Sequence, residues 1–139
     1  MVPHSVVVDF AVALLITSMA CDLLGRVAEE DDLVTVATWT LYFGTMAAGF
    51  AVLSGYAAHD LAAPTGAAGE TALSHRNAAL VTLSCFAACT IWRLRGHGEI
   101  RGRWCGLYWL IASVGLGSLV VTGWLGGRLV FFHGVGVGL

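Results

Sequence analysis

Four long apolar runs constrain this chain more than any other feature of its sequence. They cover roughly residues 6–24, 33–58, 75–93 and 104–125. A helix needs about 20 predominantly apolar residues to cross the hydrocarbon core of a bilayer, where lipid offers the backbone no hydrogen-bond partner. The runs therefore predict four transmembrane α-helices. We expect one membrane domain, residues 1–139, whose Gly- and Val-rich C-terminal segment, 126–139, lies at the membrane surface instead of forming a helix.

The connections between the runs are short, which makes consecutive helices antiparallel. We therefore expect an all-α, four-helix transmembrane bundle with up-down-up-down topology and both termini on the same side. We find no convincing internal repeat in the sequence. Only 12% of the residues are charged, about half the share of a soluble domain. This composition argues against a free-standing soluble enzyme, and the net charge of −2 gives no indication of nucleic acid as a partner.

The distribution of arginine predicts the orientation. The face that holds both termini carries two arginines, Arg76 and Arg128, and the opposite face carries five, which are Arg26, Arg93, Arg95, Arg101 and Arg103. Because cytoplasmic loops are enriched in basic residues, we expect the five-arginine face to be cytoplasmic. The protein is then a multi-pass membrane protein with N- and C-termini outside, which means the bacterial inner membrane and periplasmic termini if the source is a Gram-negative bacterium.

Four of the five histidines come to the terminal face in this topology, although they lie far apart in the sequence: His4, His59, His75 and His133. One interpretation is a cofactor site, because imidazole is a ligand of haem iron and of several transition metals. The other is a set of structural histidines at the polar interface. The sequence leaves both open, so haem b or a transition metal is a candidate cofactor and none is certain.

Several charged residues lie within or beside the apolar runs. Asp9 is expected to lie inside the first helix, where an ionisable group is costly and therefore a functional candidate. Its expected partners are Arg76, Arg128 or a histidine, either in an ion pair or as support for a ligating imidazole. Asp22 and Arg26 are spaced to pair across one helical turn. Arg93 is expected to extend its charge toward the interface.

Small residues suggest where helices approach closely. Gly44, Ala48 and Ala51 lie along one stripe of the second run, and Gly123 and Gly127 form a G-x-x-x-G pattern near the end of the fourth. Such patterns permit close helix packing. They serve either packing within the bundle or docking of another membrane subunit.

The sequence contains no constellation that indicates independent catalysis. There is no nucleophile–base pair, pair of catalytic carboxylates or nucleotide-binding loop. The four cysteines form neither C-x-x-C nor C-x-x-C-H, so covalent haem attachment is unsupported, and we interpret them as packing residues. We do not expect the chain to be an enzyme on its own.

Two stretches resemble a known family. The C-terminal stretch Gly-Gly-Arg-Leu-Val-Phe-Phe-His-Gly-Val-Gly-Val (126–137) and the start His-Ser-Val-Val-Val-Asp-Phe-Ala (4–11) are similar to the bacterial membrane proteins called domain of unknown function 2231. His75 also resembles a histidine that this family often places there. Asp9 stands where the family usually has histidine, and Ser5 and Ala11 replace its prolines. Members often accompany cytochrome-like or Rieske-type domains, so the resemblance implies a link to electron transfer.

These observations favour one function and leave two alternatives. We expect a small integral membrane accessory subunit of a respiratory or photosynthetic electron-transfer complex, which stabilises larger membrane subunits within the lipid bilayer. The first alternative is a b-type haem or metal-binding electron carrier that uses the histidines of the terminal face. The second is a small permease with Asp9 as its ion site.

Overall fold

The protein consists of four long helices in its computed structural model, which describes residues 4–62, 64–96, 100 and 103–135, without the side chains of residues 58–62. The helices are α1 (His4–Val27), α2 (Asp31–Ala62), α3 (Gly66–Arg95) and α4 (Cys105–Phe131). All four are long and apolar enough to cross a membrane. The predicted all-α, four-helix membrane architecture is confirmed.

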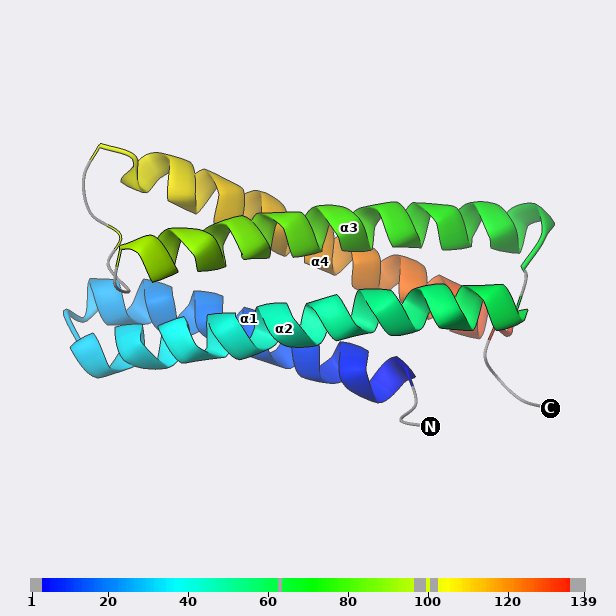
Figure 1. Ribbon diagram of the computed structural model, residues 1–139, viewed down its shortest axis with the longest axis horizontal. Helices are drawn as coiled ribbons and strands as arrows, with labels where there is room; N and C mark the ends of the chain where they lie inside the picture. Colours follow the sequence, from blue (N-terminus) through cyan, green and yellow to red (C-terminus); the bar gives the residue numbers. More distant parts are fainter. Residues whose placement is uncertain (1–3, 63, 97–99, 101–102, 136–139) are drawn as a thin grey trace.

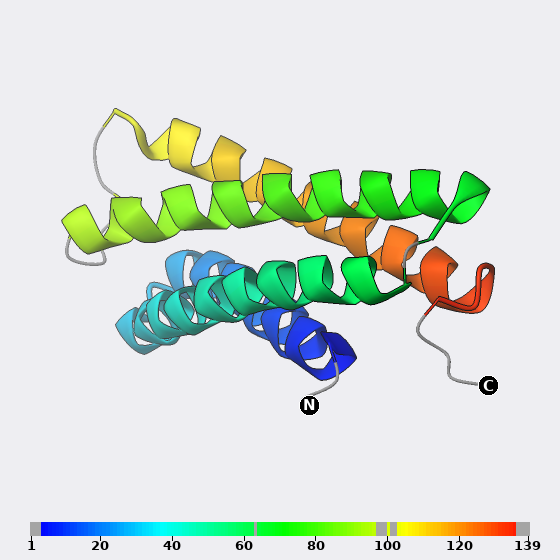
Figure 2. The same cartoon turned by 45° about the vertical axis from the view of Figure 1, so that its right-hand side comes forward.

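The helices run back and forth along one bundle axis (Figure 1). The start of α1, the end of α4 and the connection between α2 and α3 lie at one end, which we name the terminal end (Figure 1). The turn from α1 to α2 and the connection from α3 to α4 lie at the other, which we name the far end. Figure 2 shows that α1 and α2 form one hairpin, and that α3 and α4 form a second hairpin stacked on it. The up-down-up-down topology is therefore confirmed.

The third helix is longer than its sequence pattern indicated, since it begins at Gly66 and not near residue 75. Pro64 separates it from α2, and the first residue, Gly66, has a φ of 60°, a conformation that glycine adopts without steric cost. The next two turns are rich in alanine, the best helix former. The segment after residue 58, expected to be a loop, is therefore largely helical.

The fourth helix also exceeds its predicted bounds, because it continues through Gly126 and Gly127 to Phe131. A continuous helix satisfies its own backbone hydrogen bonds, which an irregular segment in lipid would not. The helix then ends in an αL cap. Gly134, with a φ of 63°, follows the last turn and its amide donates to the carbonyl of Val130 over 3.1 Å, while the amide of Val135 donates to the carbonyl of Leu129 over 2.9 Å. The expectation that the segment 126–139 forms no helix is therefore wrong for residues 126–131, and its location at the membrane surface stays a prediction.

Each hairpin is held closely by a glycine in its second helix. A Cβ atom on Gly44 of α2 would lie 2.9 Å from Leu15 of α1, and one on Gly115 of α4 would lie 2.9 Å from the Cβ of Cys85 of α3. Real Cβ atoms do not approach other atoms so closely. These glycines therefore let the paired backbones approach, and the apolar core forms around them.

Candidate functional site

A buried ion pair joins the two hairpins near the far end of the bundle. Asp22 of α1 and Arg93 of α3 are both fully buried, and Nη2 of Arg93 lies 2.5 Å from Oδ2 of Asp22. Two charges buried in an apolar interior are tolerated only when they are paired and well hydrogen-bonded. Tertiary packing thus brings together two polar groups that lie far apart in the sequence.

The guanidinium of Arg93 contacts all three of the other helices. Besides Asp22 of α1, it donates through Nη1 to the hydroxyl of Thr38 of α2 over 2.5 Å. Its Nε donates to the hydroxyl of Tyr108 of α4 over 2.9 Å. Arg26 completes the cluster, because its Nε lies 3.3 Å from Oδ1 of Asp22. The side chain of Arg93 thus links all four helices near the far end of the bundle.

The sequence indicated only part of this cluster. The pair between Asp22 and Arg26 is confirmed, but the expectation that Arg93 extends toward the interface is wrong, since its side chain is 0% exposed. Its carboxylate partner lies on another helix of the bundle, and a buried charge is tolerated there because it is paired and hydrogen-bonded. The available signal was two opposite charges, each within an apolar run and near the same end of the bundle.

At the terminal end, His4 of α1 rests against α2. Its Nδ1 lies 2.8 Å from the hydroxyl oxygen of Ser54. A Cβ on Gly55 would lie 3.3 Å from Cε1 of His4, closer than most real Cβ contacts. The absence of a side chain at Gly55 therefore makes room for the imidazole.

His75 of α3 has the same kind of environment on α4. Its Nδ1 donates to the backbone carbonyl of Thr122 over 3.0 Å, and a Cβ on Gly126 would lie 3.2 Å from its Cε1. His4 and His75 are also near enough to each other to interact electrostatically. The fold thus brings two of the four singled-out histidines together, each supported by the partner helix of its own hairpin.

The hydrogen bonds define which nitrogen of each imidazole is available. A carbonyl can only accept, so Nδ1 of His75 carries the proton. In the 2.8 Å contact between Nδ1 of His4 and the hydroxyl of Ser54 either group can donate, and the 3.0 Å contact of that hydroxyl with the carbonyl of Ala51 favours Nδ1 as the donor. In the neutral state both Nε2 atoms then carry a free lone pair. Histidines that bind metals are commonly oriented in this way by a hydrogen bond from the other nitrogen.

The remaining two histidines are placed differently. His133 lies just beyond α4, where its Nε2 is 3.4 Å from the hydroxyl of Thr71 on α3. The side chain of His59 falls outside the described residues. Within the described part of the chain, no three His, Cys, Asp or Glu residues gather into a group that could hold a metal ion. The geometry therefore singles out a pair of histidines.

The charged residues expected near the histidines face other directions. Asp9 is exposed on the outer surface of α1, and no ion pair to it occurs among the described residues. Arg76 lies over the ring of Tyr56, 5.7 Å from its centroid, and Arg128 lies 5.1 Å from the centroid of Trp124. A role for Asp9 as an ion site, or as a partner of a histidine, stays a prediction.

The small residues fall into two groups. On α2, Gly44 contacts Leu15 of α1 and Ala48 belongs to the buried core, while Ala51 is half-buried. On α4, a Cβ on Gly123 would meet no atom within 4 Å, and one on Gly127 would meet only Phe131 of the same helix. The first stripe therefore packs inside the bundle, and the second is open on its outside.

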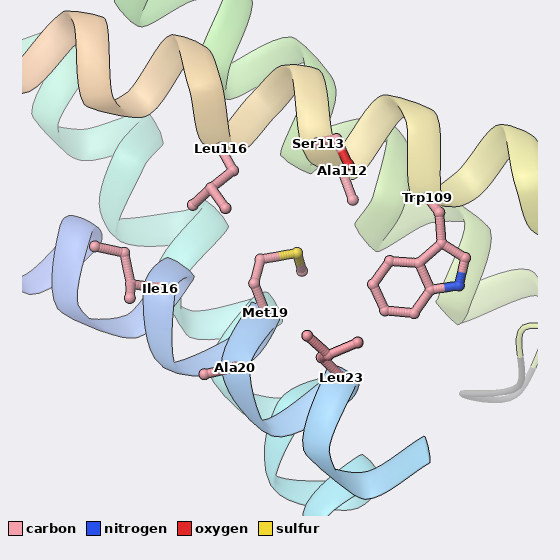
Figure 3. A pocket seen from close by; sticks show the side chains of 8 residues that line it. All are labelled: Ile16, Met19, Ala20, Leu23, Trp109, Ala112, Ser113 and Leu116. Carbon is pink, nitrogen blue, oxygen red and sulfur yellow. The ribbon is translucent and has the colours of Figure 1, made fainter. Parts of the chain in front are cut away.

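An apolar groove lies between α1 and α4, where the two hairpins diverge. It has a volume of about 410 Å³ and is lined by four residues from each helix: Ile16, Met19, Ala20, Leu23, Trp109, Ala112, Ser113 and Leu116 (Figure 3). Arg26 lies over the ring of Trp109 at 5.6 Å. Nothing in the lining offers a set of converging polar groups, so this groove alone does not define a binding site.

Four apolar helices, a buried inter-hairpin ion pair and polar groups at the two ends define a small four-helix membrane protein. The chain belongs to the family of predicted membrane proteins designated DUF2231, whose family model matches residues 3–139. No curated protein and no solved structure shows significant similarity to the chain. The resemblance noted from the sequence is thereby confirmed at the level of the family.

Proposed function

We propose that this protein is a small integral membrane subunit of an electron-transfer complex, respiratory or photosynthetic. The observation that carries the proposal is the placement of His4 and His75 at the terminal end, where Nδ1 of each is hydrogen-bonded to the partner helix of its own hairpin. Paired imidazoles are a frequent ligand set for redox-active iron in membrane helices. The resemblance to a family that often accompanies cytochrome-like and Rieske-type domains supports the same conclusion.

An accessory, stabilising role is supported by the outer surface of α4. Gly123 and Gly127 leave its backbone accessible to another helix, and small residues spaced in this way mark helix–helix contacts in membranes. Trp124 between them is largely exposed, and aromatic residues are enriched at protein interfaces. The surface therefore suits docking against a membrane subunit of the same complex.

Co-purification in mild detergent tests this role. We expect other membrane subunits to remain bound to the chain and to be identified by mass spectrometry. Gly123→Leu should weaken their retention without lowering the thermal stability of the isolated chain, because its side chain would project into open space. Gly106→Leu is the matched control, since Gly106 also has no atom within 4 Å but lies at the far end. Recovery of the chain alone as a monodisperse species would contradict the accessory role.

A second candidate is an electron carrier that holds haem b or a transition metal with the terminal-end histidines. The specific observation in its favour is the hydrogen bonding of both Nδ1 atoms, which leaves two ligand nitrogens of the correct protonation state. A visible absorption spectrum and metal analysis of the purified protein separate the two candidates. The carrier requires a Soret band or a stoichiometric metal, and the accessory role requires neither.

We also propose that the protein lies in the bacterial inner membrane with both termini outside. Arg93 is neutralised by Asp22 inside the bundle, so the charge bias rests on the other arginines. Arg26, Arg95 and Arg103 lie at the far end, Arg101 falls in the sequence between α3 and α4, and Arg76 and Arg128 lie nearer the terminal end. The bias toward a cytoplasmic far end therefore persists.

A further inference from the structure

The buried positions of the first hairpin recur in the second at a constant spacing of 71 residues. In α1 the buried residues include Ala11, Leu15, Ser18 and Asp22, and 71 positions later α3 buries Thr82, Phe86, Cys89 and Arg93. In α2 the buried residues are Ala37, Leu41, Gly44 and Ala48, and α4 buries Tyr108, Ala112, Gly115 and Leu119 at the equivalent positions. Among the buried residues of the described helices, Met19, Gly25 and Leu125 are the ones without a buried equivalent.

Close contacts repeat at the same spacing. Gly44 approaches Leu14 and Leu15, and its equivalent Gly115 approaches their equivalents, Cys85 and Phe86. At the terminal end, Gly55 supports His4 and its equivalent Gly126 supports His75.

These correspondences relate the two hairpins by an approximate two-fold axis along the bundle. Operating this axis exchanges α1 with α3 and α2 with α4, which fits the two stacked hairpins of Figure 2. The sequence did not reveal the repeat, because few equivalent residues are identical and the pattern is one of burial.

The ion pair shows that equivalent residues of α1 and α3 meet across this axis. Asp22 and Arg93 occupy equivalent positions, and they bond directly. His4 and His75 each precede their member of this pair by 18 residues, which is five turns of an α-helix at 3.6 residues per turn. The two imidazoles therefore lie on the same helix faces as the ion pair, at the other end of the bundle.

The backbones of the two diagonal helices are not in direct contact. In the described part of the chain, no Cα atom of α1 lies within 8 Å of a Cα atom of α3. Asp22 and Arg93 span that separation because an arginine side chain is long. Two imidazoles are shorter, and an atom that accepts one nitrogen from each would complete the connection.

We infer that the chain is a tandem repeat of a helical hairpin, and that its approximate two-fold axis carries one metal centre ligated by Nε2 of His4 and Nε2 of His75. This inference rests on the proposed electron-transfer function and names the ligands of that site. The shared chemistry is a transition-metal atom that accepts two neutral imidazoles. Haem iron is the form that two ligands satisfy, because the porphyrin supplies its other four, while a bare ion would need additional donors.

Titration of the purified full-length chain in detergent with hemin tests this inference. We expect one hemin per chain and the spectrum of six-coordinate, low-spin iron. His4→Ala and His75→Ala should each weaken binding at least tenfold and convert the iron to five-coordinate, and the two variants should behave alike because the positions are equivalent. His133→Ala is the matched control and should bind as the wild type does.

A second arm distinguishes haem from a free ion. Equilibrium dialysis of the haem-free chain against Zn²⁺ or Cu⁺ should show one bound ion per chain, dependent on both histidines, if a bare ion is the natural occupant. Retained helicity by circular dichroism confirms that each variant folds. In His75→Gly, added free imidazole should restore the six-coordinate spectrum of the bound haem iron.

The inference is overturned if neither hemin nor an ion binds stoichiometrically, or if only one of the two histidines matters. Co-purification of membrane subunits with a chain that binds neither probe would overturn the metal centre while leaving the proposed subunit role intact.

Discussion

The 2.5 Å contact between Nη2 of Arg93 and Oδ2 of Asp22 connects α3 with α1, which lie diagonally opposite each other in the bundle. Because Arg93 also donates to Thr38 and Tyr108, this contact is the centre of a polar cluster to which every helix contributes. The neighbouring ring of Tyr108 lies 5.6 Å from the guanidinium carbon and shields it further. The two hairpins are thereby held in a defined register.

Replacing one member of this pair should destabilise the fold strongly. Arg93→Leu leaves the carboxylate of Asp22 buried with only the partly exposed Arg26 beside it, and we expect a loss of about 3–5 kcal/mol in the free energy of unfolding. Arg95→Leu, on the same helix but exposed, should change it by less than about 0.5 kcal/mol. Thermal unfolding in a fixed detergent, followed by circular dichroism, compares the two. Equal melting temperatures for both variants would contradict the role given to Arg93.

Removing both charges should restore most of the stability that the single change loses. In the double variant Asp22→Leu with Arg93→Leu, no carboxylate is left buried, and well-packed apolar residues often match or exceed a buried ion pair. We expect a coupling energy of about 2–3 kcal/mol between the two sites. A double-mutant cycle of thermal or denaturant unfolding measures it, and additive losses would show that the residues act separately.

Close packing inside the second hairpin should depend on Gly115. Gly115→Ala places a methyl group 2.9 Å from Cβ of Cys85, which cannot move without the backbone of α3. We expect a destabilisation of about 1–3 kcal/mol. Gly117→Ala is the matched control on the same helix, because nothing lies within 4 Å of its added methyl. That variant should be neutral or more stable, by up to about 1 kcal/mol, since alanine favours helix.

The orientation of His75 should depend on Gly126. In Gly126→Ala the added methyl would lie 3.2 Å from Cε1 of His75, so the imidazole must shift and its hydrogen bond to Thr122 must lengthen. We expect hemin or metal binding to weaken several-fold with little loss of helicity. Hemin titration of this variant, beside Gly106→Ala as a control, checks the effect. Unchanged affinity would indicate that the glycine does not support the imidazole.

The proposed orientation predicts which connections a reagent reaches from outside. In a cysteine-free variant, Thr65→Cys lies between α2 and α3 at the terminal end, and Glu30→Cys lies in the turn between α1 and α2. A membrane-impermeant maleimide should label Thr65→Cys in intact cells and Glu30→Cys only after permeabilisation. The reverse pattern would place the termini in the cytoplasm.

The architecture could be predicted because it follows from apolar length alone. Runs such as residues 33–58 must form helices in lipid, and short connections make them antiparallel. Element ends were less accurate. The start of α3 at Gly66 depends on alanine-rich residues that extend beyond the predicted span, and the end of α4 depends on an αL cap at Gly134.

The sequence by itself determined that this protein spans a membrane, that its termini share one end, and that His4 and His75 belong to that end. Only the tertiary structure decided that Asp22 and Arg93 bond, and that the two histidines are supported by Gly55 and Gly126. The physical reason is that hydropathy and loop length act along the chain. Pairing across a bundle depends instead on which helix faces meet. Those faces are set by the buried positions, which recur in the two hairpins at a spacing of 71 residues.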